Sequence, residues 1–208
     1  MTTIGTALGL GLASGLSLYG AAFLTGLVIH LGWIHVDPAW AALRVLADPP
    51  VLLLTGALFL LEFFADKIPW VDSVWDVLHT VIRPIGGALL ALRALGHVDP
   101  TVEVVAFLLL GGVTLTTHAA KASLRLLVNL SPEAVSNVVV SLAENGFLVG
   151  AVWLALAHPV TALAVSALAL VVAGWVVLTI GRGAVRVLRR RGWRSTVASG
   201  SGSARSAS

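Results

Sequence analysis

The stretch EFFADKIPWVDSVWDVLHT, residues 62–80, decides the fold, because it places ionisable side chains between two strongly apolar segments. The run VLLLTGALFLL, residues 51–61, precedes it, and GGALLALRAL, residues 86–95, follows it closely. A helix needs about 20 mostly apolar residues to span a bilayer. The ionisable residues therefore lie at the end of one candidate membrane helix and at the start of the next.

The composition of the chain indicates an integral membrane protein. Hydrophobic residues make up 58% of it and charged residues only 11%, whereas soluble domains average about 45–50% and about 25%. The chain contains no cysteine, which excludes disulfides and thiolate sites. Its net charge is +3, and the arginines between 182 and 194 follow the last apolar run. Such a cluster is typical of the cytoplasmic side and of contact with anionic lipid, so we expect no nucleic-acid partner.

The apolar runs predict an all-α bundle of six transmembrane helices in a single domain, residues 1–191. The third helix is expected to be kinked or broken near Pro84. In the longest connection, 30–49, the segment PAWAALRVLA is expected to form a short interfacial helix. Residues 192–208 are predicted to be a flexible basic, Ser/Gly-rich tail. The six helices are expected over residues 4–29, 50–67, 70–95, 103–128, 133–157 and 160–187.

The number of helices also predicts the orientation. Six crossings put both termini on the same side, and the arginine-rich end is expected to be cytoplasmic. Lys67 and the connection after Arg125 then also lie inside, whereas the other side carries Arg44 and Arg93. We therefore expect cytoplasmic N- and C-termini.

The spacing of proline and glutamate suggests an internal repeat. Pro50 precedes Glu62 by twelve residues, and Pro132 precedes Glu144 by the same distance. Two inverted three-helix repeats, residues 1–96 and 103–187, would explain this match. Chance similarity between two apolar helices is the alternative.

The ionisable residues are not scattered around their helices. A step of about 100° per residue puts Asp76, His79 and Arg83 within about 40° of Asp72. The same step gathers His118, Lys121, Arg125 and Asn129 within about 80° on the fourth helix. On the fifth helix, Glu133, Asn137, Ser141 and Glu144 share a face of the same width, about 80°. Glu62 and Asp66 lie about one turn apart on the second.

This phasing allows the charged side chains to face one another rather than lipid. A charge at the bilayer centre costs about 2.5–3.5 kcal/mol even on the lenient insertion scale, and an unpaired buried charge tends to neutralise. Two interpretations remain open: an architectural ion-pair network and a solvated functional cavity. The candidate site residues are Glu62, Asp66, Lys67, Asp72, Asp76, His79, Arg83, His118, Lys121, Arg125, Asn129, Asn137 and Glu144.

Other motifs are weaker. The GxxxG spacings Gly5/Gly9 and Gly11/Gly15 permit close helix contact, within the bundle or at the seam of a homo-oligomer. Ser14, Ser17 and Tyr19 on the same segment could reach the cavity. No nucleotide-binding or hydrolase motif is present, so we expect no enzymatic activity. We expect no cofactor either; carboxylate and imidazole groups would suit a divalent cation as an alternative, but no diagnostic ligand spacing occurs.

Three segments resemble a known family. They are GLGLASGLSLYG (9–20), LEFFADKIPWVDSVWDVLHTVIRP (61–84) and AKASLRLLVNLSPEAVSNVVVSLAEN (120–145). The last two look like the signature blocks of the bacterial membrane family called domain of unknown function 4126, and the first resembles the start of that family. The resemblance implies a polytopic protein of the bacterial inner membrane and brings no activity with it.

The residues themselves favour a small transporter for an ion or small polar solute, with proton coupling as one option. The carboxylates would bind the cation or proton, and the two histidines would relay it. Arg83, Lys121 and Arg125 would pair the carboxylates or hold an anionic group. The alternatives are a structural or assembly protein, and a membrane protein that grips a lipid phosphate with these three cations.

Overall fold

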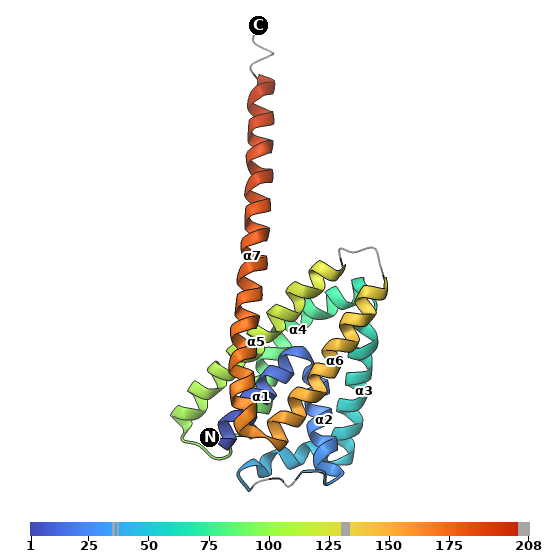
Figure 1. Ribbon diagram of the computed structural model, residues 1–208, viewed down its shortest axis with the longest axis vertical. Helices are drawn as coiled ribbons and strands as arrows, with labels where there is room; N and C mark the ends of the chain where they lie inside the picture. The colour runs from blue at the N-terminus through green and yellow to red at the C-terminus, as the bar shows by residue number, and fades with distance from the viewer. Residues whose placement is uncertain (35, 37, 130–133, 204–208) are drawn as a thin grey trace.

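All the regular structure that the computed structural model describes is helical (Figure 1). It describes the backbone of residues 1–34, 36, 38–129 and 134–203. Within these ranges, the side chains at 39, 69, 129, 134–136, 184 and 187–203 are not described. The elements are α1 (Thr2–Leu16), α2 (Leu18–His30), η1 (Pro38–Ala47), α3 (Pro49–Ala65), α4 (Pro69–Arg93), α5 (Pro100–Asn129), α6 (Ala134–Ala157) and α7 (Pro159–Ser203). Five of them begin at a proline, whose fixed φ suits the first helical turn.

The predicted first crossing, residues 4–29, is two short helices rather than one. Ser17 has extended backbone angles, φ −153° and ψ 111°, and its hydroxyl accepts a hydrogen bond from the Gly20 amide at 2.9 Å. This N-cap starts a second helix inside the apolar run. Thr2 and Trp33 line one pocket, so α2 returns to the end of the bundle where α1 begins (Figure 1).

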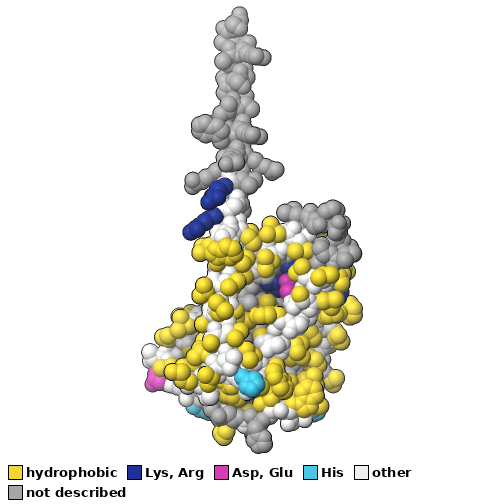
Figure 2. Space-filling model, viewed as in Figure 1, with side chains coloured by type: hydrophobic (Ala, Val, Ile, Leu, Met, Phe, Trp, Pro, Cys, Tyr) yellow, Lys and Arg dark blue, Asp and Glu magenta, His cyan; other side chains and the backbone are white. Residues whose placement is uncertain are grey.

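The remaining helices run alternately between the two ends of the bundle (Figure 1). In the described residues, three helical segments are long and apolar enough to cross a membrane: Pro100–Val128, Asn137–Ala157 and Pro159–Gly183. A fourth is obtained if Trp40–Ala47 and Pro49–Ala65, bent by 76° to each other, count as one span. α1 and α2 are too short, and α4 carries four charged residues. Hydrophobic side chains cover much of the outer surface in Figure 2, as expected for contact with lipid.

Two details differ from the sequence predictions. α4 is one helix that contains Pro84, so of the predicted kink or break at this residue, the break is wrong. Proline removes only one backbone hydrogen bond, and the most extensive helix contact in the fold is the one between α4 and α5. It includes Arg83, which contacts His118 just before Pro84, and Gly87 after it, where an added Cβ would lie 2.6 Å from Thr114. α7 continues as helix to Ser203, through most of the predicted flexible tail; no proline follows Pro159 to stop it.

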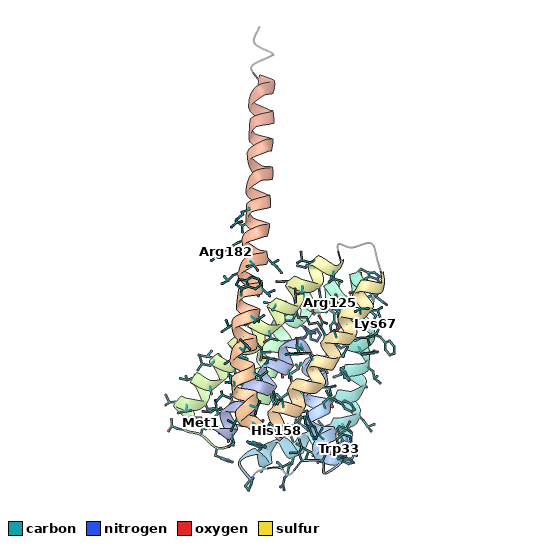
Figure 3. All side chains as sticks on the ribbon, in the orientation of Figure 1. Met1, Trp33, Lys67, Arg125, His158 and Arg182 are labelled. Atoms are coloured by element: carbon teal, nitrogen blue, oxygen red, sulfur yellow. The ribbon has the colours of Figure 1, made fainter. Side chains whose placement is uncertain are left out.

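The predicted inverted repeat is not supported by the arrangement of the two halves. The first half opens on the broken pair α1 and α2, whereas the second opens on α5, which is unbroken over 30 residues. Figure 3 also places Met1 and Arg182 toward opposite ends of the bundle. The prediction that both termini lie on one side assumed that the first segment crosses as a single helix.

The glycines of α1 allow its close approach to neighbouring helices, as the GxxxG spacing predicted. A Cβ on Gly5 would overlap the carbonyl of Pro159, and one on Gly9 would lie 2.6 Å from the Ala155 Cβ. A Cβ on Gly15 would lie 2.5 Å from the Thr117 Cβ. The first segment therefore packs inside the bundle through these glycines.

This packing gives a direct test. Gly5→Ala is expected to lower the free energy of unfolding by about 1–3 kcal/mol, because the backbone at Pro159 must move. The matched control is Gly174→Ala, where nothing lies within 4 Å of the added Cβ and no loss is expected. Equilibrium unfolding of both variants in mixed micelles measures the difference. Equal stability of the two variants would contradict the close approach of α1 to α7.

Candidate functional site

The predicted ionisable residues come together in one buried cluster. It is formed by the end of α3, the first half of α4, the second half of α5, the first half of α6 and the break between α1 and α2. Ten of the candidate side chains are buried: Glu62, Asp66, Asp72, Asp76, His79, Arg83, His118, Lys121, Arg125 and Asn137. Lys67 and Glu144 are partly buried. The side chain of Asn129, and Glu133 altogether, lie outside the described part of the chain.

Arg83 is the centre of the first group of contacts. Its Nη2 donates to Glu62 Oε1, and its Nη1 lies 3.3 Å from Asp76 Oδ1 and 2.7 Å from His118 Nδ1. Glu62 Oε2 also accepts a hydrogen bond from the Ser17 hydroxyl. A fully buried guanidinium is thus shared by two carboxylates and an imidazole, which we call the Arg83 group.

The contacts of His118 fix its protonation. Arginine can only donate, so His118 Nδ1 must accept from Arg83. The proton of the neutral ring is then on Nε2, which lies 3.2 Å from both the Asp76 carbonyl and the Thr80 hydroxyl. In this arrangement His118 is neutral and both nitrogens are used. Relay of a proton through His118 would require Arg83 to move.

His79 differs from His118, because one of its nitrogens makes no hydrogen bond. Nδ1 lies 2.8 Å from the Trp75 carbonyl and therefore donates to it, whereas Nε2 is buried without a partner in the described residues. The ring stacks on Trp75 at 4.7 Å and meets the edge of Tyr19 from α2 at 5.5 Å. Of the two histidines predicted to relay protons, His79 alone has a free basic nitrogen.

Lys121 and Arg125 form the second group of contacts, the Lys121/Arg125 group. Lys121 Nζ lies 2.9 Å from Asp66 Oδ2 and 3.8 Å from Glu144 Oε2. Arg125 Nη2 lies 2.7 Å from Glu144 Oε2 and 3.5 Å from Asp66 Oδ2. Arg125 Nη1 also donates to Asn137 Oδ1 at 2.8 Å, so that helices α3, α5 and α6 are joined here.

The break between α1 and α2 connects the two groups. The last carbonyl of α1, at Leu16, accepts a hydrogen bond from Lys121 Nζ at 3.0 Å. Glu62 lies at the other side of the break, bonded to the Ser17 hydroxyl that caps α2. A cation at a helix C-terminus and an anion at an N-terminus are both favourable. The C-terminus of α1, the negative end of its dipole, therefore faces Lys121, and the N-terminus of α2, the positive end, faces Glu62.

Sequence reasoning missed two partners in this site. The Leu16 carbonyl has no side-chain signal, because any residue could provide it. Thr80 did have a signal, since the step used for Asp72 and Asp76 places it about 80° from Asp72. Its hydroxyl donates to the Asp76 carbonyl at 2.9 Å and lies beside His118.

Within the described part of the chain, the cluster holds more carboxylates than cations. Four carboxylates (Glu62, Asp66, Asp76, Glu144) and three cations (Arg83, Lys121, Arg125) make its ion pairs. Adding Asp72 and Lys67 gives five against four, again one carboxylate in excess. The excess is in the Arg83 group, because Lys121 and Arg125 balance Asp66 and Glu144.

The cluster is not completely enclosed. Glu144 is 16% exposed, the most of any side chain in these ion pairs. Figure 2 shows basic and acidic atoms at the bottom of an opening in the hydrophobic surface, in the upper half of the bundle. Figure 3 places Arg125 in the same region. Sparse contact between α5 and α6 fits an opening here.

The arrangement of these groups does not form a metal centre. Within the described residues, no three histidine, aspartate or glutamate side chains converge in a way that could hold a metal ion. Each carboxylate of the ion pairs instead contacts a guanidinium or an ammonium group. A divalent cation therefore has no ready ligand set in the described cluster.

The fold and the cluster define a class: an all-helical membrane protein with apolar outer surfaces and a buried network of ion pairs between its helices. Comparison with protein families agrees with this class. The family model described as "Domain of unknown function (DUF4126)" matches residues 4–179, and the chain belongs to that family. The comparisons with curated proteins and with solved structures gave no match.

Proposed function

We propose that this protein is a small membrane transporter for a cation or a small polar solute, coupled to protons. The observation that carries the proposal is the excess carboxylate buried beside the break between α1 and α2. Glu62 and Asp76 share Arg83 as their cationic partner. A low-dielectric interior disfavours an uncompensated carboxylate, so the Arg83 group has a capacity for one proton or one monovalent cation.

The broken helix supports the same function. In transporters, discontinuous helices place backbone carbonyls and helix ends at the ion site near the bilayer midplane. Here α1 ends and α2 begins at Ser17, in contact with Glu62. His79, with its free Nε2, packs against Tyr19 of α2. We assign Glu62 and Asp76 to proton or cation binding and His79 to proton transfer.

The opening beside α6 provides a route to the cluster. Glu144 is its most exposed carboxylate, and Arg125 holds it through three hydrogen bonds of 2.7–3.2 Å. A solute or ion entering here would meet Glu144 first. We propose that Glu144 and Arg125 act as the entrance of the pathway, and the Arg83 group as its internal site.

Flux through proteoliposomes tests this assignment. An entrapped pH-sensitive dye reports proton entry driven by a potassium diffusion potential, with and without an added sodium gradient. Glu62→Gln and Glu144→Gln, together, are expected to reduce flux about tenfold or more, because neutral amides keep the shape but not the charge. The control is Asp48→Asn, an exposed carboxylate that makes no cap hydrogen bond. Unchanged flux in the double variant would make the assignment wrong.

A second function is favoured by a different observation. Nearly every charged group in the cluster has a charged partner within 4 Å, and such pairing is also what an architectural network requires. An assembly or structural protein would use it to fix helix packing. The lipid-phosphate alternative has less support, since Lys121 and Arg125 already hold Asp66 and Glu144.

The proposed membrane arrangement has five crossings and one re-entrant hairpin. α3, α4, α5, α6 and α7 cross in turn, whereas α1 and α2 enter and leave on one side. Lys67, Arg182 and Arg186 then share a side, which the positive-inside rule makes cytoplasmic in a bacterial inner membrane. Thr2 lies on the other side. The first lysine or arginine of the given sequence is Arg44, so the positive-inside rule does not place residues 2–30 on the cytoplasmic side.

A further inference from the structure

A cavity lies at the end of the bundle away from the ion-pair cluster. Its volume is about 590 Å³, within the range of small-molecule sites. The walls are η1, the end of α4, the connection to α5 and the first turns of α5. Arg93 on its wall is ten residues beyond Arg83 on α4, which places it about 15 Å farther along the helix. The cavity is therefore separate from the site of the proposed function.

One part of the wall is apolar and continuous with the outer surface. Leu89 and Leu108 line the cavity and are 53% and 67% exposed, and Phe107 and Leu92 lie beside them. Exposed leucines on the outside of a membrane bundle contact acyl chains. The cavity thus opens sideways to lipid as well as toward the end of the bundle.

The other part of the wall carries charges of both signs. Arg93 and Glu103 line the cavity, both are exposed, and neither makes an ion pair within the described residues. His97 lies between them in the sequence and lines the same cavity. This end of the bundle also carries Trp33 (Figure 3), 64% exposed and suited to the head-group layer.

We propose that this cavity binds a zwitterionic phospholipid whose head group carries a primary ammonium, that is, a phosphatidylethanolamine. Arg93 holds the phosphate, for which a guanidinium is well suited. Glu103 accepts hydrogen bonds from the ammonium group. The acyl chains lie along Leu89, Leu92 and Leu108.

Charge complementarity selects this lipid over two others. An anionic phosphatidylglycerol offers Glu103 only neutral hydroxyl donors, so no positive charge in its head group balances the carboxylate. A phosphatidylcholine has a quaternary ammonium, which cannot donate a hydrogen bond to Glu103. A free phosphate would satisfy Arg93 alone and leave the apolar wall uncovered.

Thermal unfolding of the purified full chain in detergent tests the proposal. Phosphatidylethanolamine is expected to raise the Tm by several degrees more than phosphatidylglycerol or phosphatidylcholine with the same acyl chains. Arg93→Ala and Glu103→Gln should each remove most of this difference. Both residues are exposed, so the variants should fold. Arg44→Ala, an exposed arginine of η1 that does not line the cavity, is the matched control and should keep the full response.

Besides stabilisation by a soluble phosphate compound, two results would overturn the proposal. One is an equal rise in Tm with all three lipids; the other is an unchanged response to phosphatidylethanolamine in both the Arg93 and the Glu103 variants. Soluble phosphoethanolamine and inorganic phosphate form the last arms of the experiment. If either alone reproduces the full stabilisation, the ligand is a soluble phosphate compound and not a lipid.

Discussion

Arg83→Met is expected to lower the free energy of unfolding by about 3–5 kcal/mol, the cost of removing one partner from a buried ion pair. Arg83 is fully buried and contacts two carboxylates, Glu62 and Asp76. Methionine fills much of the same space but leaves both carboxylates without a cation. Unfolding in mixed micelles with increasing denaturing detergent, followed by circular dichroism, measures the loss.

Two further variants separate the lost charge from the lost volume. Arg44→Met removes an exposed guanidinium and should change stability by less than about 0.5 kcal/mol. Adding Glu62→Gln to Arg83→Met removes one stranded charge and should recover at least about 1 kcal/mol. No recovery, or a loss below about 1 kcal/mol for Arg83→Met, would show that the pairs contribute nothing in the membrane protein.

Glu62→Gln alone distinguishes the two proposed functions. An architectural network uses the Arg83–Glu62 ion pair to hold α4 against α3, so the neutral variant should be destabilised by the loss of that pair. A proton-binding Glu62 is neutral in part of its cycle, so the amide should be tolerated in stability and should lose flux. Loss of flux with unchanged stability therefore supports transport, and loss of stability supports an architectural role.

The helical step around α4 predicted the most important feature of the site. Asp72, Asp76, His79 and Arg83 were expected on one face, and the structure buries all four. Periodicity is a local property, and the penalty for charges facing lipid leaves few alternatives. The same reasoning correctly brought Lys121, Arg125 and Asn137 to the cluster from α5 and α6.

The break at Ser17 was not predicted from the sequence. An apolar run of 26 residues, 4–29, is long enough to cross a bilayer, and a serine inside it is common. Tertiary contacts favour the break. Glu62, 45 positions away, accepts a hydrogen bond from the Ser17 hydroxyl, and Lys121 donates one to the Leu16 carbonyl. For the same reason, hydropathy alone does not identify α4 as a membrane helix. Other helices cover its charged residues, and the hydropathy of one segment does not include that contact.

Single cysteines are expected to show that Thr2 and Lys67 lie on opposite sides of the membrane. The chain has no native cysteine, so each introduced thiol is the sole target. Thr2→Cys should react with a membrane-impermeant maleimide from the same side as Asp48→Cys and Asp99→Cys. Ile68→Cys and Arg182→Cys, both exposed positions, should react from the other side. Labelling is measured by gel shift in intact cells and in inverted vesicles. Each variant should react in one of these two preparations and not in the other.

The decisive position is Thr2, because every other site has the same side in a six-crossing arrangement. Six crossings put Thr2 with Ile68 and Arg182; a re-entrant hairpin puts it with Asp48 and Asp99. Thr2 reacting from the cytoplasmic side would mean that α1 and α2 cross in series, and the Ser17 break would then lie within a spanning segment. Reaction from the opposite side places the hairpin tip, with Ser17 and the Leu16 carbonyl, inside the membrane next to Glu62 and Lys121. Those two charges then meet the broken helix from within the bilayer, which is the geometry that the proposed ion site requires.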